Sequence, residues 1–389
     1  ADLPSRGPAA ITGLGVITAA GTDLDGFWER ALRPPEVGPP TGPVDFDPSP
    51  WIGERTRWKT EPETWYAVAA AALALEDAGL APDPWRTAVC LSTVYAATDL
   101  IERGLRAVDE GAPPPMHLGA EACGNAAAAH VAMAHGLHGP NRSAVNACAG
   151  GSQAIGDAVD LLALGRCDSA LAGAAQGPLP AVFLANYRAM RVATASGEVR
   201  PFDLRRDGTH FTDGAVVAAL EPAALAAARG ATVLAEVSGQ ATVADATSMV
   251  ASSQDTIRSC MALALDDAGI DPASVAAVIA HGTATRMNDA VEAAAIAELF
   301  PHRPPVTSVK RAFGHTMAGA GPVNAAVATL AFRHGVLPPV STDLTPDPSI
   351  AELVDVVGGE PRPLAPGPIV VNAFGLGGTN TTLVLSPPA

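Results

Sequence analysis

Short hydrophobic runs alternate along this chain with longer segments in which hydrophobic residues recur at helical spacing. Short apolar runs are typical of buried strands, and the helical spacing is typical of helices packed on a core. Buried strands are predicted at residues 87–93, 142–147, 169–175, 275–280, 305–309 and 368–373. The main helices are predicted at residues 63–79, 125–137, 153–164, 254–268, 289–300 and 319–334, with a long loop at 183–214. This alternation indicates a layered α/β protein.

The pattern of strands and helices runs through both halves of the chain. A length of 389 residues exceeds the size at which one hydrophobic core usually stops growing. Each half also places a strand, a polar turn and a small-residue helix in succession, around Cys148 and around His315. We therefore expect two related halves, residues 1–230 carrying Cys148 and residues 231–389 carrying His281 and His315, although no residue-level repeat stands out.

Composition excludes several classes of protein. With 48% hydrophobic and 16% charged residues, the chain can build a large core and is not globally disordered. A net charge of −16 argues against a nucleic-acid partner, whereas an acidic protein partner would need a local basic patch made of arginines. The five cysteines are odd in number and lack a C-x-x-C pair, which argues against a disulfide framework or a zinc site. We find no signal peptide and no apolar run of membrane-spanning length, so we expect a cytoplasmic protein without membrane contact.

The stretch around Cys148 is the first candidate for chemistry. A predicted strand leads into Cys148, followed by Gly150, Gly151 and the helix over residues 153–164. At the start of a helix, unpaired backbone N–H groups and the helix dipole favour a thiolate, which is the nucleophilic form of cysteine. A small buried cysteine in a tightly packed turn is the alternative, and this stretch alone leaves both interpretations open.

Three further polar turns follow buried strands. They contain His281-Gly-Thr-Ala-Thr285, Lys310-Arg-Ala-Phe-Gly-His315 and Asn372-Ala-Phe-Gly-Leu-Gly-Gly-Thr-Asn380. Each alone has an ordinary structural explanation, and the glycine-rich turn lacks the following helix that a phosphate loop requires. One cysteine and two histidines at strand ends nevertheless suggest nucleophilic acyl chemistry. The glycine-rich turn could donate a backbone N–H to an oxyanion.

These motifs, in this order, resemble the β-ketoacyl-acyl-carrier-protein synthase family, the condensing enzymes of type II fatty acid and polyketide synthesis. The resemblance rests on Ala-Cys-Ala, His-Gly-Thr-x-Thr, Lys-x-x-x-Gly-His and Asn-x-Phe-Gly-x-Gly-Gly-Thr-Asn. The segments Pro201-Phe202-Asp203 and Arg206-Asp207-Gly208 also fit, so the similarity covers nearly the whole chain. It implies an α/β thiolase-like fold, with two related halves in a five-layer αβαβα arrangement.

The resemblance implies a role for each reactive side chain. Cys148 matches the nucleophile that takes the acyl chain as a thioester. His281 and His315 match the pair that assists decarboxylation of a malonyl thioester. Lys310 matches the lysine that supports the second histidine, and Glu292 matches a buried glutamate of the same network. We expect Lys310 to keep its charge by pairing with Glu292, because an unpaired buried ammonium is costly.

The resemblance also implies binding roles and a reaction. Thr283 and Thr285 match threonines that bind the phosphopantetheine arm, and the backbone N–H groups of Cys148 and Leu376 match the oxyanion hole. The implied reaction is a decarboxylative Claisen condensation with malonyl-acyl-carrier-protein that extends a fatty acid or polyketide by two carbons. It implies acyl carrier protein as a partner, no metal or dissociable cofactor, and a homodimer or a heterodimer with a related chain-length subunit.

Several positions depart from the family pattern. Leu376 and Thr209 stand where the family usually has phenylalanine, Ala284 stands where it usually has glycine, and Gly150-Gly151 replaces a small hydroxyl pair. We expect Thr209 and Gly150 to contact substrate and to open the acyl pocket. An unusual acyl group and a specialised pathway are therefore predicted, while the starter unit and chain length stay open.

Three other functions have to be distinguished from decarboxylative condensation. The altered pocket is compatible with acyl transfer or condensation with a non-malonyl nucleophile. A non-catalytic chain-length partner is a second alternative, although such subunits lack the cysteine that this chain has at 148. Biosynthetic thiolases use a second catalytic cysteine near the C-terminus, and no cysteine follows Cys260 here.

Overall fold

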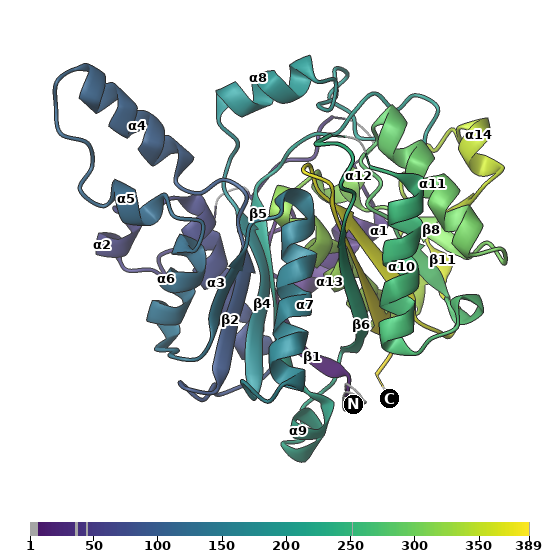
Figure 1. The fold of residues 1–389 in the computed structure, drawn as a ribbon, viewed down its shortest axis with the longest axis horizontal. Helices are drawn as coiled ribbons and strands as arrows, with labels where there is room; N and C mark the ends of the chain where they lie inside the picture. Colours follow the sequence, from purple (N-terminus) through teal and green to yellow (C-terminus); the bar gives the residue numbers. More distant parts are fainter. Residues whose placement is uncertain (1–6, 36–37, 44–45, 251, 389) are drawn as a thin grey trace.

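The computed structural model describes residues 7–35, 38–43, 46–250 and 252–388. Within them, the main strands join into one 11-stranded sheet in the order β10-β8-β7-β12-β13-β6-β1-β5-β4-β2-β3 (Figure 1). These strands are β1 (Ala9–Ile17), β2 (Thr87–Ser92), β3 (Asn141–Ala144), β4 (Ser169–Gln176), β5 (Gly214–Pro222), β6 (Ala235–Ala244), β7 (Ala277–Ile279), β8 (Pro305–Thr307), β10 (Asp355–Val356), β12 (Ile369–Phe374) and β13 (Thr379–Ser386). A separate pair consists of β9 (Val336–Leu337) and β11 (Arg362–Pro363).

Helices flank the sheet along its whole width (Figure 1). They are α1 (Leu24–Leu32), α2 (Glu54–Arg57), α3 (Pro62–Asp77), α4 (Thr98–Asp109), α5 (Leu118–Glu121), α6 (Ala126–His135), α7 (Gly150–Ala163), α8 (Ala181–Ala189), α9 (Ala223–Ala228), α10 (Gln254–Ala268), α11 (Arg286–Leu299), α12 (Lys310–Phe313), α13 (Ala320–His334) and α14 (Pro348–Ala351). None of these described helices combines the length and the apolar composition that crossing a bilayer requires.

The sheet has two halves with the same pairing pattern. In the first half, β2 runs parallel to β3 and β4, β4 is antiparallel to β5, and β5 is antiparallel to β1. In the second half, β7 runs parallel to β8 and β12, β12 is antiparallel to β13, and β13 is antiparallel to β6. A short antiparallel pairing of β1 with β6 joins the two halves. The exact division between residues 230 and 231 stays a prediction.

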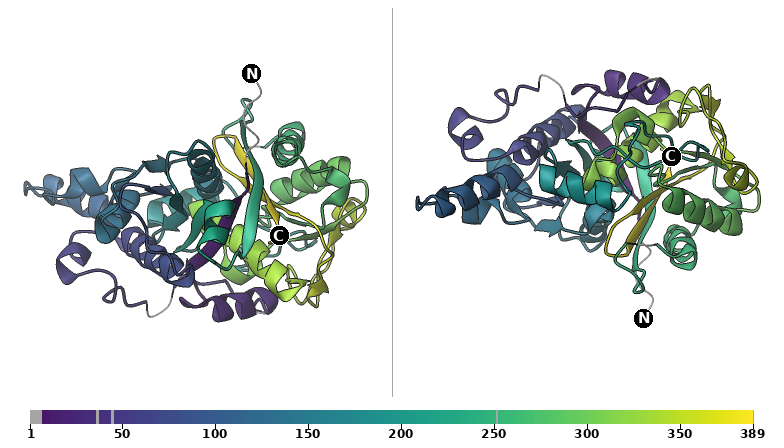
Figure 2. Two further views of the ribbon diagram at one scale, coloured as in Figure 1. Left: turned by 90° about the horizontal axis from the view of Figure 1, so that it is seen from below. Right: turned by 90° about the horizontal axis from the view of Figure 1, so that it is seen from above.

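The elements stack in five layers. α3 and α6 cover the outer face of the first half-sheet, and α10, with α11 beside it, covers the outer face of the second. α7 and α13 lie between the half-sheets, since α7 contacts β2 and β4 on one side and β13 and β6 on the other. Figure 2 shows the two halves side by side around this centre. The order is the αβαβα arrangement predicted from the sequence.

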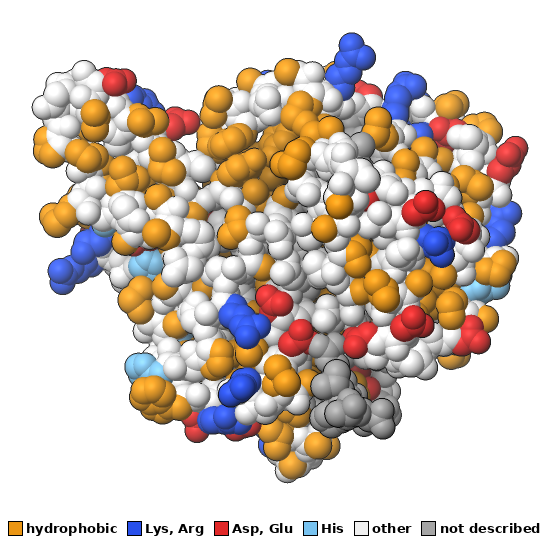
Figure 3. All heavy atoms as spheres, in the orientation of Figure 1, with side chains coloured by type: hydrophobic (Ala, Val, Ile, Leu, Met, Phe, Trp, Pro, Cys, Tyr) orange, Lys and Arg blue, Asp and Glu red, His pale blue; other side chains and the backbone are white. Residues whose placement is uncertain are grey.

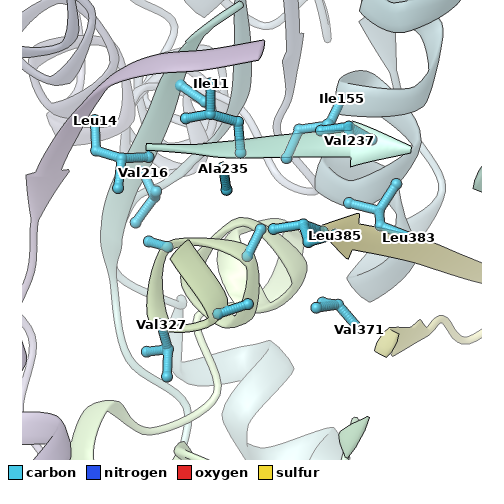
Figure 4. Packing of buried hydrophobic residues seen from close by; sticks show 14 of the residues in the cluster. Ile11, Leu14, Ile155, Val216, Ala235, Val237, Val327, Val371, Leu383 and Leu385 are labelled. Atoms are coloured by element: carbon cyan, nitrogen blue, oxygen red, sulfur yellow. The ribbon is translucent and has the colours of Figure 1, made fainter. Parts of the chain in front are cut away.

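The two central helices approach each other closely because small residues line their contact. A side chain at Gly151 would place its Cβ 2.2 Å from the backbone oxygen of Ala318, and one at Gly321 would lie 1.9 Å from the Ser152 hydroxyl. Hydrophobic side chains from β1, β5, β6, β12 and β13 then close around α7 and α13 (Figure 4). The tight contact brings the N-terminal ends of both helices together, and with them the turns that carry Cys148 and His315.

Two elements differ from the prediction. The helix α8 lies where a loop was predicted. The strand before Cys148 ends at Ala144, and Ala147–Ala149 form a 3₁₀ turn that leads directly into α7. The helix predicted at residues 63–79 spans Pro62–Asp77 as α3, and it is buried on most sides between the strands and α6.

Candidate active site

Four of the predicted turns line one cavity of about 740 Å³. Its wall includes Cys148 before α7, His281 after β7, His315 before α13, and Leu376 in the turn between β12 and β13. Because α7 and α13 meet at their N-terminal ends and β7 pairs with β12, residues far apart in sequence converge at one place. The structure therefore brings together the predicted nucleophile, both histidines and Leu376, whose backbone N–H is predicted to contribute to the oxyanion hole.

Cys148 follows a strained turn. Ala147 has a left-handed backbone with φ 45°, a conformation that non-glycine residues adopt only when the surroundings enforce it. The Cys148 side chain is only 6% exposed, and burial raises the pKa of its thiol to about 12. The Lys310 charge and the backbone N–H groups of Cys148 and Leu376 lower this pKa but do not offset the burial. Desolvation therefore outweighs the effect of the helix terminus, and the group is a thiol at neutral pH.

The backbone N–H groups of Cys148 and Leu376 act on the same sulfur. Both lower the pKa of the thiol through hydrogen bonding, which places them within reach of the Cys148 sulfur. Gly375 makes this approach possible, because a Cβ there would lie 2.7 Å from the backbone oxygen of Asn146. The arrangement has the geometry of a pair of donors facing the atom on which an acyl group would be carried.

The two histidines face each other with ring centroids 5.4 Å apart and planes at 81°. Burial, and then the positive charge of Lys310, hold the pKa of both His281 and His315 well below the ordinary value. Both rings are therefore neutral at neutral pH. The backbone N–H of Met317 donates to Nδ1 of His315 over 3.2 Å, so the ring proton of His315 lies on Nε2 and can be donated.

Lys310 and Glu292 both bind the His281 turn. The Lys310 ammonium donates to the backbone oxygen of His281, and Glu292 accepts the backbone N–H groups of His281 and Gly282 over 2.8 Å each. Burial lowers the pKa of Lys310 to about 8, and the charge of Glu292 opposes that change. The expectation that Lys310 and Glu292 form a direct ion pair is therefore corrected, because each of them binds the backbone instead. Lys310 binds the carbonyl of His281 and Glu292 binds the adjoining N–H groups, so the two side chains together fix the position of His281.

Comparison with known families identifies this arrangement. Residues 40–226 match the model described as the Beta-ketoacyl synthase N-terminal domain, and residues 234–342 match the model of the C-terminal domain. The chain belongs to the β-ketoacyl synthase family. The predicted family is confirmed, and with it the enzyme class, a β-ketoacyl synthase.

Individual relatives support the same assignment. The chain is 34% identical to the 3-oxoacyl-[acyl-carrier-protein] synthase 2 of Rhizobium meliloti (strain 1021), over 87% of this chain and 84% of that protein. It is 31% identical to a Streptomyces halstedii protein named as a polyketide beta-ketoacyl synthase, over 97% of both chains. The structure of the ishigamide ketosynthase/chain length factor superposes with a TM-score of 0.91 at 28% identity, covering 99% of this chain and 100% of that one. The predicted thiolase-like fold is thereby confirmed.

Behind the histidines of this β-ketoacyl synthase lies a buried amide network that sequence reasoning missed. Asn372 donates to Glu292 over 3.1 Å and accepts a hydrogen bond from the Thr382 hydroxyl over 2.9 Å. Asn324 on α13 donates to the backbone oxygens of Ala280 and Asn372. The network joins β7, β12, β13 and α13 directly beneath His281. An asparagine within the otherwise apolar pattern of α13 was the available sequence signal.

Asp289 holds two strained segments at the cavity edge. Its carboxylate accepts the backbone N–H of Phe202 over 2.8 Å and that of Ala284 over 3.1 Å. Both residues are left-handed, with φ 62° and 63°. This conformation explains why glycine is usual at the position of Ala284, since only glycine adopts it without strain. Burial raises the pKa of Asp289 to about 6 against these bonds.

The structure places Thr283 and Thr285 on the cavity wall, as predicted for substrate contact. Their hydroxyls lie 2.9 Å apart, and Thr285 accepts the backbone N–H of Asn288 over 3.3 Å, which caps the start of α11. Thr285 therefore has a structural task that fixes the orientation of the pair. Their role toward the pantetheine arm stays a prediction.

Gly150 and Thr209 lie elsewhere than predicted. Gly150 does not line the cavity, because a Cβ there would lie 2.3 Å from the Ser92 hydroxyl behind the nucleophile turn. Thr209 is fully buried, and its hydroxyl has no hydrogen-bond partner within the described residues. Phe211 provides the aromatic ring instead, stacked on His315 with centroids 5.5 Å apart. The expectation that these two residues open the acyl pocket is corrected, because neighbouring segments cover both of them.

Much of the cavity wall comes from residues that sequence reasoning did not select. Tyr187 on α8, Phe211 and Phe374 line it, together with Arg191 and Arg286 at its mouth. Most of these residues lie in the segment predicted as loop. The apolar spacing within Ala181–Ala189 was the available signal for α8.

Proposed function

We propose that this β-ketoacyl synthase carries an acyl group on Cys148 and condenses it with malonyl-acyl-carrier-protein in a specialised pathway. The observation that carries the proposal is the meeting of one thiol, two neutral imidazoles and two backbone N–H donors in a single buried cavity. A condensing enzyme must bind an acyl group and then generate a carbanion beside it. The cavity holds separate groups suited to each of these steps.

Acyl loading is an exchange between two thioesters. The Cys148 sulfur attacks the acyl carbonyl, the bond to the pantetheine sulfur breaks, and the thiol proton leaves with the departing thiol. Because burial raises the pKa of Cys148, this proton must leave as the new carbon–sulfur bond forms. The N–H groups of Cys148 and Leu376 stabilise the oxygen of the tetrahedral intermediate, since they already face the sulfur.

Decarboxylation uses the histidines. Loss of carbon dioxide from the malonyl group leaves a negative charge on the thioester oxygen, to which neutral His281 and His315 donate N–H groups. A donor of this kind contributes about 2.7–4 kcal/mol to a barrier. Each ring is 3% exposed, so little water competes for the oxygen or protonates the carbanion. The carbanion then attacks the Cys148 thioester, and the Cys148 sulfur leaves and regains a proton.

The remaining predicted residues support these steps. Lys310 hydrogen-bonds to the backbone carbonyl of His281 and Glu292 to its N–H, so we propose them as positioning residues. Thr283 and Thr285 are proposed to bind the pantetheine arm at the cavity entrance. No dissociable cofactor and no metal enters this scheme. A cytoplasmic location with the carrier protein belongs to the same proposal.

A labelled-carrier assay tests the reaction. The protein is incubated with carboxyl-labelled malonyl-acyl-carrier-protein and an acyl-carrier-protein, and released carbon dioxide and β-ketoacyl product are measured together. Equal amounts of both are expected. Product without carbon dioxide would favour condensation with a non-malonyl nucleophile. Neither product nor release, with the partner subunit present, would favour a non-catalytic chain-length role.

We propose acyl carrier protein as one partner and a second ketosynthase-like subunit as the other, either another copy of this chain or a related chain-length subunit. The strand β3 lies at the outer edge of the sheet and leads within a few residues to Cys148. Val145, which directly follows β3, and Met133 on α6, a helix that contacts β3, both have exposed side chains. We propose this edge as the dimer contact, because an unpaired strand edge and exposed apolar side chains favour association.

The carrier is proposed to dock over Arg191 and Arg286 at the cavity mouth, beside Arg188 on α8. None of the three arginines has an ion pair among the described residues, and basic side chains are visible near α8 (Figure 3). In a chain of net charge −16, this cluster suits an acidic carrier and the phosphate of its pantetheine arm.

Reversing the charges of this cluster is expected to weaken carrier binding. The double substitution of Arg191→Glu and Arg286→Glu should raise KM for an acyl-carrier-protein about tenfold at low salt, because like charges then face the carrier. A carrier-free pantetheine thioester should be affected much less. Arg333→Glu, at the opposite end of α13, is the matched control. A similar KM increase for both substrates would contradict docking at this site.

A further inference from the structure

Two tyrosine hydroxyls are hydrogen-bonded to each other beside the nucleophile. The hydroxyls of Tyr95 and Tyr187 lie 2.9 Å apart. Tyr187 lines the cavity, and both rings belong to the apolar cluster that also contains Cys148 and Met317. Burial raises the pKa of Tyr187 above its ordinary value, and the Cys148 thiol is near enough to contribute to that rise. The tyrosine pair therefore forms part of the wall that an acyl group on Cys148 would face.

Buried polar side chains hold the backbone of Tyr95 in place. Gln176 accepts the N–H of Val94 over 3.1 Å and donates to the backbone oxygen of Tyr95 over 3.2 Å. Two residues further on, the N–H of Ala97 donates to Glu63 over 2.6 Å. Both flanks of Tyr95 are thus tied to other elements, β4 and α3. A side chain on such a support presents its hydroxyl at a defined position.

Aromatic contacts fix the rings as well. Tyr95 stacks on Phe183 with centroids 4.1 Å apart and planes at 18°, and Phe183 lies one turn before Tyr187 on α8. The ring centroids of Tyr187 and Phe211 lie 4.6 Å apart, and the Phe211 ring stacks on His315. A continuous wall of rings therefore leads from the catalytic histidine to the tyrosine pair. The two hydroxyls are its polar atoms.

One of the two tyrosine O–H groups has no hydrogen-bond acceptor among the described residues. Each tyrosine hydroxyl has one O–H donor and can also accept. The bond between them consumes a single donor, and neither hydroxyl has another partner within the described residues. The side chains around the pair include Val94, Leu179 and Leu184, which offer no acceptor. A group in the acyl pocket that accepts a hydrogen bond would satisfy the remaining O–H.

We propose that Tyr187, supported by Tyr95, selects acyl groups that carry an oxygen along the chain, as a ketone or hydroxyl, over saturated chains of equal length. This proposal rests on the proposed function, in which Cys148 carries the acyl group. A saturated chain against the wall would shield the free O–H from water without replacing its hydrogen bond, whereas an oxygenated chain accepts that bond. Tyr187 is thus a specificity-determining residue and takes no part in bond formation.

Acyl-loading rates measured by intact mass test the selection. Wild-type protein and Tyr187→Phe are each given pantetheine thioesters of hexanoic, 3-oxohexanoic and 5-oxohexanoic acids. The ratio of oxo to saturated loading is compared between variants, which cancels the intrinsic reactivity of each thioester. For at least one oxo acid, this ratio is expected to fall about tenfold in Tyr187→Phe, mainly through slower oxo loading.

Two further variants distinguish the effect of the Tyr187 hydroxyl from the effect of the shape of the pocket wall. Tyr95→Phe leaves the Tyr187 hydroxyl in place, so most of the oxo preference should remain. Phe183→Leu changes the wall without removing a hydroxyl, so the ratio should stay near the wild-type value even if total loading changes. Thermal unfolding of each variant checks that the wall is intact.

An unchanged ratio in Tyr187→Phe, or an equal fall in Phe183→Leu, would overturn the selection while loading on Cys148 continued. Failure of every thioester to load on the wild-type protein would instead contradict the proposed function, and the selection with it. These two failures are distinguishable because peptide mapping reports loading on Cys148 for each acid separately.

Discussion

Replacing Cys148 with alanine is expected to abolish acyl loading and to lower condensation by about 10⁴-fold or more, because no other described residue of the cavity wall carries a thiol. Intact mass measures loading, and labelled product measures condensation. Release of carbon dioxide from malonyl-carrier should persist in Cys148→Ala, since His281 and His315 are untouched by the change. Loading and decarboxylation are thereby assigned to different groups of the same cavity.

Cys123→Ala is the matched control for this variant. Cys123 is an exposed free cysteine, so its loss should change neither loading nor condensation. If the assembled enzyme with Cys148→Ala kept its full condensing activity, the nucleophile would lie on the partner, and this chain would be a non-catalytic chain-length subunit. Loading that persisted in Cys148→Ala would indicate that the acyl group is carried elsewhere.

Replacing His315 with alanine is expected to produce the opposite pattern. Decarboxylation of malonyl-carrier should fall about 10²–10³-fold, the usual cost of removing one donor to a developing oxyanion. Loading of Cys148 should continue, because the N–H groups of Cys148 and Leu376 that face the sulfur remain. The measurement is carbon dioxide release and acyl loading on the same preparation, compared with His138→Ala, an exposed histidine that stacks on Trp85.

The protonation state of His315 makes this prediction sharper. Its Nδ1 accepts the N–H of Met317, so the donated proton lies on Nε2. Glutamine can place an amide N–H near the position of Nε2, and His315→Gln is therefore expected to recover part of the lost decarboxylation. Because burial and Lys310 hold the pKa of His315 well below its ordinary value, the histidine contributes no change in rate as the pH rises from about 6.5 to 8. Equal activity of the alanine and glutamine variants would contradict N–H donation.

Cys148 and Glu292 show why the sequence indicates the functional side chains but not their protonation states or their hydrogen-bond partners. From the sequence, the helix terminus favoured a thiolate at Cys148, with a buried cysteine left as the alternative, and an ion pair was expected between Lys310 and Glu292. In the structure, burial keeps Cys148 protonated, and Glu292 bonds to the backbone of His281 and Gly282. A pKa depends on how many other segments exclude water from a group, and that number has no local signature in the chain.

The pocket wall was the part least accessible from sequence. Gly150 and Thr209 were expected to contact substrate because they depart from the family pattern, yet Ser92 lies against the first and neighbouring backbone covers the second. Tyr187 and Phe211 lie in a segment predicted as loop and line the cavity instead. A residue that differs from the family's usual one shows that the position has changed, but it does not show whether its side chain faces the cavity.

The sequence by itself determined the alternation of strands and helices, the family, and the chemical groups that end the strands before Cys148, His281 and His315. These features are local, because a strand, a tight turn and a helix are encoded by neighbouring residues. Only the tertiary structure decided that α7 and α13 meet at their N-terminal ends, that both imidazoles are neutral, and that Tyr95 and Tyr187 share a hydrogen bond in the cavity wall. Each of these depends on contacts between segments distant in the chain, because burial and hydrogen-bond partners arise only when those segments pack together.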